Sequence, residues 1–599
     1  MFKIKKREQI DEKFQWKISN LYPNTSAWEK DFNKLKKNLN SFSKFQGQLG
    51  SSPKILSQCL NKMVSLEKLY AKLYSYALTL HDQDARKNTG QTLYTNSSQL
   101  STELNTILAF IQPEILSLPT TKLKKFMANK ILFKYQHFLD NLIRLRKYVL
   151  SEKEEKIVAQ SGYLSQAPEK AYETLATLNL PWPEVKLNTN KKIILTPAMY
   201  SKLRGSSNRQ ERLKIFTTFW NTYSNFRETF ASLLSGAVNR DHYYAQVRGY
   251  KNDLEYALYS NNLSTAVYTT MISQVKIHLP LLWKYLRLHK KNLKVSSLGY
   301  HDLYAPSFSA FKPKYTYAKA YNLILAATAP LGQEYTQIMQ KAFTSGWTDV
   351  FPNQDKRAGA YMLGAAYEVH PYILLNYTDD YESLTTTAHE FGHAAHSYLS
   401  NQNQAFIYAN YPIFVAEVAS IVNEQLLNLY LLDTCQNHKE KAYLLNKYLE
   451  NWRLTVFRQT LFAEFELKIH TLAQNGQALT ADLLDKTYLD LLHEYYGHKQ
   501  GITIIDSKYA SEWAYVPHFY YTFYMFQYTT SFIAATAIAQ DIYAGKTKRQ
   551  LGYWKMLKAG GSKYALDLLK LAGVDMSTTT PYKNAFKILE KTLSSNIIR

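Results

Sequence analysis

Apolar residues recur three and four positions apart over most of residues 12–190, which is the spacing of amphipathic helices. Short polar breaks separate the periodic stretches. The clearest predicted helices span residues 25–39, 53–80, 93–110 and 113–126. This part of the chain is therefore predicted to be almost wholly helical.

The first clear break is the segment 178–185, because Pro181 and Pro183 cannot lie inside a helix. Residues 192–197 follow as a predicted short strand, and helical periodicity resumes at Pro197, continuing over 210–238 and 263–289. We place a boundary near residue 190. It separates an N-terminal helical lobe, 1–190, from a second domain, 191–599.

Residues 355–377 differ from the rest, being rich in glycine, aromatic and β-branched residues. They predict a small sheet directly before the next helix. An edge strand at Gly359, Ala360 and Tyr361 would bind an extended peptide by backbone pairing. The alternative is that this hairpin only packs on the helix.

That helix carries His389-Glu390-Phe391-Gly392-His393. One helical turn separates the two histidines, so both imidazoles can reach a single cation. Zinc fits this pair, because a catalytic zinc takes three protein ligands and keeps one position for water. Glu390 would lie beside the metal, where its carboxylate can take a proton from the bound water.

A third ligand is expected from the following apolar segment, where an unpaired carboxylate would be costly. Glu417 is our choice. Glu424, seven residues later, is either an orienting partner of an imidazole or a surface carboxylate. His396 is a rival ligand, but it lies two turns from His389. A second similar pattern, His493 to His498, has its histidines five apart and is predicted to be structural.

Composition indicates a globular chain of two or more lobes, with 599 residues, 46% hydrophobic and 20% charged. Two cysteines, no leader sequence and no apolar run of about 20 residues predict a cytoplasmic protein outside the membrane. The net charge is +24, but the lysines are scattered at helix spacing, which argues against nucleic-acid binding. No obligate protein partner is evident.

Several segments together resemble the oligoendopeptidase F branch of the thimet-type metallo-oligopeptidases. They are Arg357–Tyr361, His370–Asn376, His389–Ser397, Glu417–Ser420 with Asn423 and Glu424, and the aromatic segment His518–Tyr528. Weaker similarity covers most of the remaining chain.

The resemblance implies one zinc ion held by His389, His393 and Glu417, with Glu390 as the base. It also implies that His518, Tyr521 and Tyr528 face the scissile carbonyl, although an aromatic core stripe would explain the tyrosines equally well. The implied fold is mainly α, a two-lobed helical body with a deep central channel and a small sheet beside the zinc helix. Lobe 1–190 would form a channel wall.

We therefore expect a zinc-dependent oligoendopeptidase that hydrolyses internal bonds of short unfolded peptides. Two rivals remain. The first is an exopeptidase that trims two residues from the C-terminus, which would need a cationic group for the terminal carboxylate. The second is a peptide-binding protein with a structural zinc, although such sites are usually closed and rich in cysteine.

Overall fold

The computed structural model describes residues 5–307, 311 and 313–595. By their internal contacts these fall into two compact units, each assembled from three separate segments of the chain. Unit 1 comprises Met1–Val149, Pro313–Leu431 and Ile538–Val574; unit 2 comprises Leu150–Lys312, Leu432–Ala537 and Asp575–Arg599. The predicted boundary near residue 190 stays a prediction about domain organisation.

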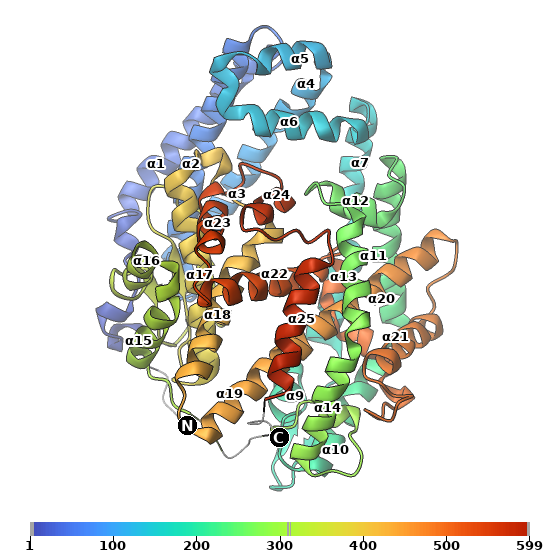
Figure 1. Ribbon diagram of the computed structural model, residues 1–599. Helices are drawn as coiled ribbons and strands as arrows, with labels where there is room; N and C mark the ends of the chain where they lie inside the picture. The colour runs from blue at the N-terminus through green and yellow to red at the C-terminus, as the bar shows by residue number, and fades with distance from the viewer. Residues whose placement is uncertain (1–4, 308–310, 312, 596–599) are drawn as a thin grey trace. The chain divides into compact units, whose positions relative to one another are not determined.

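Unit 1 is mostly helical (Figure 1). Side chains before the first turns cap the early helices: the Asn24 carboxamide accepts the N–H of Ala27, and the Ser52 hydroxyl accepts that of Ile55. The helices are α1 (Thr25–Leu39), α2 (Pro53–Asp82), α3 (Asn88–Leu108), α4 (Ile111–Ser117), α5 (Thr120–Met127), α6 (Gln136–Leu145), α15 (Tyr317–Thr328), α16 (Gln333–Thr344), α17 (Tyr381–Asn403), α23 (Thr547–Ala559), α24 (Ala565–Leu571) and α18 (Ile413–Thr434), whose last turn, from Leu432, belongs to unit 2.

A three-stranded sheet lies in unit 1, in the order β3 (Thr348–Asp349), β5 (Tyr372–Leu374), β4 (Tyr361–Leu363). The central strand β5 runs parallel to β3 and antiparallel to β4. Helix α17 packs against β4 and β5. The small sheet predicted before the histidine-bearing helix is thus confirmed, and β4 forms one of its edges.

The core of unit 1 joins segments far apart in the sequence. Buried apolar residues of α1 to α6 form one cluster with Tyr372 and Leu374 of β5 and with Ala366 of the connection between β4 and β5. Burial of such side chains contributes about 1.5–3 kcal/mol each. The N-terminal helices and the sheet beside α17 therefore belong to one hydrophobic core.

Unit 2 is also helical, with one two-stranded antiparallel sheet, β1 (Glu184–Lys186) and β2 (Lys192–Ile194). Strand β2 was predicted, whereas β1 was interpreted only as a break. The helices are α7 (Glu152–Ser165), α8 (Ala167–Thr174), α9 (Pro197–Leu203), α10 (Arg209–Ser224), α11 (Arg227–Val247), α12 (Asp253–Tyr259), α13 (Thr265–Ile277), α14 (Leu279–Leu293), α19 (His438–Asn451), α20 (Arg458–Gln474), α21 (Ala481–Tyr495) and α25 (Thr580–Leu593), while α22 (Phe526–Tyr543) begins in unit 2 and ends in unit 1.

The mainly α prediction is confirmed, but three predicted helices are each two. The helix predicted over 113–126 breaks at Leu118, which is extended because Pro119 follows it. The helix predicted over 263–289 divides at His278, with Pro280 in the first turn of α14. The helix predicted over 210–238 divides at Asn225 and Phe226. Within the described part of the chain, no helix combines the length and apolar character needed to cross a membrane.

Candidate active site

Helix α17 brings His389 and His393 to the same face, as the i, i+4 spacing predicted. The helix begins where the Asp380 carboxylate accepts the N–H of Ser383 at 2.7 Å, which satisfies a donor that the first turn leaves free. The two rings stand almost perpendicular, at 82°, with centroids 4.8 Å apart. Each ring thus directs its Nε2 atom toward the same region.

Gly392 lets α18 approach α17 closely enough for its carboxylate to join the histidines. A Cβ atom at this position would lie 2.6 Å from the carbonyl oxygen of Ala419 and 2.6 Å from Cα of Ser420. Both are backbone atoms of α18, so no side-chain adjustment could make room. The small residue between the histidines is therefore required by the helix crossing.

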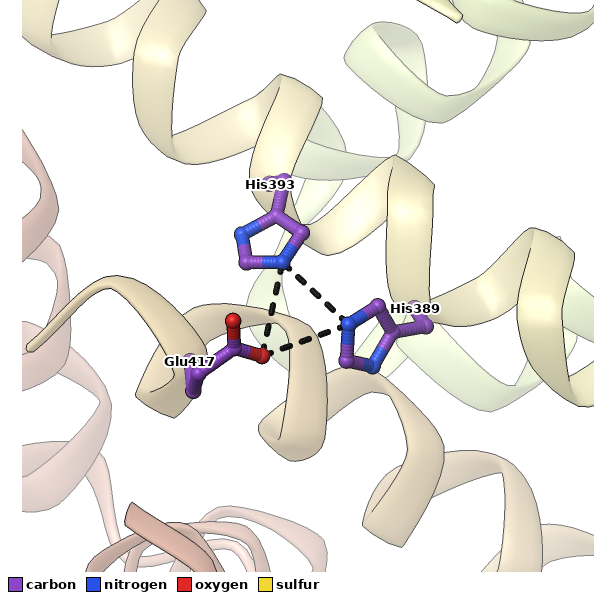
Figure 2. Close-up of side chains that lie close together, drawn as sticks. All are labelled: His389, His393 and Glu417. Carbon is purple, nitrogen blue, oxygen red and sulfur yellow. Dashed lines mark hydrogen bonds and ion pairs between the residues drawn. The ribbon is translucent and has the colours of Figure 1, made fainter. Parts of the chain in front are cut away.

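Three donor atoms converge at this crossing (Figure 2). The distances are 3.2 Å between His389 Nε2 and His393 Nε2, 3.3 Å between His389 Nε2 and Glu417 Oε2, and 3.5 Å between His393 Nε2 and Glu417 Oε2. Tetrahedral zinc with bonds of about 2.0–2.1 Å would separate its ligand atoms by roughly 3.3 Å. The donor set therefore fits zinc in both chemistry and spacing.

Glu424 orients the first of these imidazoles. Its Oε1 atom lies 2.6 Å from His389 Nδ1, so Nδ1 carries the proton and the lone pair of Nε2 is left for a metal. Of the two alternatives for Glu424, the structure thus shows the contact with an imidazole. Its neighbour Asn423, fully buried, donates to the carbonyl of Ala388 at 3.1 Å and accepts from the Tyr335 hydroxyl at 2.7 Å.

The pKa values of the two carboxyl groups next to the histidines are shifted in opposite directions. Glu390 is buried, which raises its pKa, while the neighbouring His389 and His393 oppose that shift. For Glu417, burial would raise the pKa, but hydrogen bonds with His389 and His393 outweigh it and hold the pKa well below its usual value. Glu417 is therefore ionised, as a metal ligand must be, and Glu390 lies outside the group of three donors.

His396, the rival ligand, is not part of the donor group. It is buried against Tyr411, with the two rings stacked 3.5 Å apart, and burial lowers its pKa to about 3. Among the described residues, neither of its ring nitrogens has a hydrogen-bond partner.

Spacing of five residues on a continuous helix would turn His493 and His498 away from each other, but their rings stack with centroids 4.0 Å apart. Helix α21 ends at Tyr495, and the chain then turns at Gly497, whose φ of +64° suits glycine. Both imidazoles lie within hydrogen-bond distance of the backbone of Ile505. This pair therefore has a role in holding the loop together.

The segment directly before the edge strand β4 borders a pocket of about 320 Å³. Gly359 and Ala360 line the pocket together with Thr386, which lies one turn before Glu390 on α17. The Tyr361 side chain turns elsewhere, because its hydroxyl donates to Asp82 at 2.8 Å. Only the backbone of Tyr361 is then available for pairing with a peptide.

The aromatic segment 518–528 lies in unit 2. Within it, the Tyr528 hydroxyl lies 3.4 Å from His518 Nε2, and the rings of His518 and Tyr521 contact edge to face. Tyr521 is 42% exposed, which is incompatible with the aromatic-core alternative for this tyrosine. Burial lowers the pKa of His518, so its imidazole is neutral near pH 7 and keeps one N–H donor.

Two features of the site were missed in the sequence. Asn423 had no assigned role, although an amide in an apolar helix, next to Glu424, signals a buried hydrogen-bond partner. Gly392 was noted only as a small residue. Its contact with α18 depends on a helix crossing that no local pattern encodes.

Comparison with known proteins shows that this chain is similar to peptidases. The model of peptidase family M3 matches residues 202–588, and that of Oligopeptidase F matches residues 114–180. Oligopeptidase PepF of Bacillus subtilis is 37% identical over 98% of this chain and 87% of its own length. An oligoendopeptidase F homolog of Lactococcus lactis is 35% identical over 98% of each chain.

Solved structures agree in fold. A Chlamydophila abortus protein of known crystal structure is 34% identical, with a TM-score of 0.92 over 99% of both chains. Oligoendopeptidase-F from Enterococcus faecium is 30% identical, with a TM-score of 0.73 over 95% of this chain and 98% of that one. The matches extend over nearly the whole chain and include the segments with the candidate donors. The chain therefore belongs to peptidase family M3, in its oligoendopeptidase F branch, and is a metallo-oligopeptidase.

Proposed function

We propose that this peptidase depends on one zinc ion and cleaves internal bonds of short unfolded peptides. The observation that carries the proposal is the group formed by His389, His393 and Glu417, whose donor atoms have the mutual spacing of zinc ligands. Relatives named oligoendopeptidase F support internal cleavage.

Zinc bound there would act as a Lewis acid on the peptide carbonyl. It would also lower the pKa of a water molecule, so that the water gives up a proton more readily as it attacks the carbonyl. Glu390 follows His389 directly and is buried, so its carboxylate is held at the site with little exposure to bulk water. We assign it as the general base that accepts the proton of the attacking water. The same carboxyl group then gives this proton to the leaving amine.

His518, Tyr528 and Tyr521 are proposed to donate hydrogen bonds to the oxyanion that forms during attack. A neutral imidazole and two phenols are suitable donors, because each has an N–H or O–H group in place before the charge develops. The proximity of His518 and Tyr528 supports a shared task for these two.

The edge strand β4 and the segment just before it are proposed to bind the substrate backbone through Gly359, Ala360 and Tyr361. Support comes from the edge position of β4 in its sheet and from the pocket that Gly359 and Ala360 line together with Thr386 of α17. Pairing of this kind recognises extended chains of any sequence. A cytoplasmic location and the absence of nucleic-acid and obligate protein partners remain predictions from the sequence.

The test uses fluorogenic peptides of graded length with wild type, a chelator-treated sample and Glu390→Gln. We expect the variant to keep its zinc and to lose several orders of magnitude of turnover, since the amide cannot accept the proton. Near-normal turnover by Glu390→Gln would refute its role as the base. Absence of stoichiometric zinc in active enzyme would refute the metal assignment.

A second comparison separates endopeptidase from exopeptidase action. Peptides of the same sequence are offered with a free or an amidated C-terminus. An endopeptidase cleaves both, whereas an enzyme that trims two residues from the C-terminus needs the free carboxylate. Selective cleavage of the free form would therefore overturn internal cleavage as the main activity.

A further inference from the structure

The aromatic segment contains two adjacent residues with positive φ angles, a left-handed backbone conformation that residues other than glycine rarely adopt. Thr522 has a φ of +28° and Phe523 a φ of +55°, and neither is glycine. A β-branched residue such as threonine is a clear outlier in this region. Such conformations persist where the surrounding structure holds them, and they gather at functional sites.

Arg240 and Asp241 of α11 hold the first half of this bend. The Arg240 guanidinium donates to the carbonyl of Tyr520 at 3.0 Å and to the hydroxyl of Thr522 at 3.3 Å. The same hydroxyl donates to the Asp241 carboxylate at 3.0 Å. Two neighbouring charged residues thus bind both the backbone and the side chain of the bend.

Glu466 of α20 holds the second half. Its Oε1 atom accepts the N–H of Phe523 at 2.6 Å. Glu466 is fully buried, and within the described part of the chain its second oxygen has no hydrogen-bond partner. Burial raises its pKa well above the usual value, because the charged form loses its hydration. A carboxyl group kept here at such a desolvation cost calls for a specific reason.

The bend lies between His518 and Tyr528, whose side chains meet at 3.4 Å. Residues 520–523 form part of the connection between these two positions, so a change in their path would move one side chain relative to the other. We infer that Glu466, Arg240 and Asp241 are positioning residues, which hold the bend at Thr522 and Phe523 so that His518 and Tyr528 stay aligned as oxyanion donors. The inference rests on the proposed role of these two donors.

A purely structural role for Glu466 makes a different prediction. The folded state would lose stability on substitution, but molecules that remain folded would turn over normally. A positioning role affects the transition state more than the bound substrate. The expected result is then a fall in kcat with little change in KM and no change in zinc content.

The experiment compares Glu466→Ala, Glu466→Gln and Glu464→Ala, each with zinc content and thermal unfolding measured beside kcat and KM. Glutamine keeps an oxygen that accepts the Phe523 N–H, so we expect its kcat to stay within about threefold of wild type. Alanine loses that oxygen, and we expect kcat to fall about 30- to 100-fold, as for a donor displaced by a fraction of an ångström. Equal kcat in the Ala and Gln variants would overturn the inference.

Glu464 supplies the matched control. It lies on the same helix and is buried, but it binds Lys276 and the Tyr495 hydroxyl instead of the bend. Loss of its carboxylate should lower stability and leave kcat within about threefold. An equal fall of kcat in Glu464→Ala would show that any buried carboxylate of α20 has this effect, and would overturn the inference.

Thr522→Val is used should Glu466→Ala fail to fold. It keeps the shape of the side chain and removes only the hydroxyl that links Arg240 with Asp241. We expect kcat to fall about tenfold with KM unchanged. A kcat equal to that of wild type would overturn the inference in the same way.

Tyr528→Phe separates failure of this inference from failure of the proposed function. If Tyr528 is a donor, Tyr528→Phe lowers kcat, and adding Glu466→Ala lowers it much less than in the wild-type background. Full additivity of the two effects would overturn the positioning role alone. Normal kcat in Tyr528→Phe would instead refute the donor role on which the inference rests.

Discussion

Gly392→Ala is expected to weaken metal binding strongly without changing any of the proposed metal ligands. The new Cβ would lie 2.6 Å from two backbone atoms of α18, whereas ordinary contacts begin at 3.4 Å. Helices α17 and α18 would have to separate by roughly 0.8 Å, since backbone at a helix crossing cannot rotate out of the way. Zinc ligation tolerates only about 0.2 Å, so Glu417 would leave the group of donors.

We expect the zinc affinity of Gly392→Ala to fall at least about 100-fold, and its unfolding free energy to fall by about 1–3 kcal/mol from overpacking. Competition with a chromophoric chelator measures the affinity, and chemical denaturation measures the stability. Gly162→Ala is the control, because a Cβ there meets nothing within 4 Å and alanine is the better helix former. Wild-type zinc affinity in Gly392→Ala would refute the argument that this crossing positions Glu417.

Three further predictions concern the surroundings of the metal ligands. Glu424→Ala should weaken zinc about 10- to 100-fold, and Glu424→Gln less, because glutamine still accepts from His389 Nδ1; equal affinities would contradict this. Asn423→Ala should lower the unfolding free energy by about 1–3 kcal/mol in chemical denaturation, since it removes the buried amide that bonds the Tyr335 hydroxyl and the Ala388 carbonyl. Burial lowers the pKa of His396 to about 3, so it stays neutral in the folded protein, whereas in the unfolded chain it binds a proton below about pH 6.5. The unfolding free energy therefore falls as pH drops below 6.5. Between pH 7 and 5, wild type should lose about 2 kcal/mol more than His396→Phe, and parallel losses would contradict this.

The local parts of the site could be predicted because they depend on spacing along one element. His389 and His393 share a face by helix periodicity alone, and Glu417 is conspicuous as a carboxylate in an apolar helix. The sheet before α17 was recognised from its aromatic and β-branched residues. Such patterns can be recognised in the sequence because they depend on residues within about ten positions of each other.

Other features depend on contacts between distant segments. The closeness of Gly392 to Ala419 arises from a helix crossing, and the left-handed Thr522 and Phe523 are held by residues of α11 and α20. Neither threonine nor phenylalanine favours that conformation, so local propensity argues for the wrong backbone. The break at Asn225 likewise has no proline or glycine to announce it.

The proposed metal ligands, together with the carboxylate that orients His389, all come from α17 and α18 of unit 1, whereas the aromatic segment belongs to unit 2. Metal binding and, on the proposed roles, oxyanion stabilisation thereby come from different parts of the gene. Variants confined to 518–528 could be assayed for turnover, with bound zinc per molecule as an internal standard. A variant that loses the metal in such an assay would report damage to folding instead of the loss of a hydrogen-bond donor.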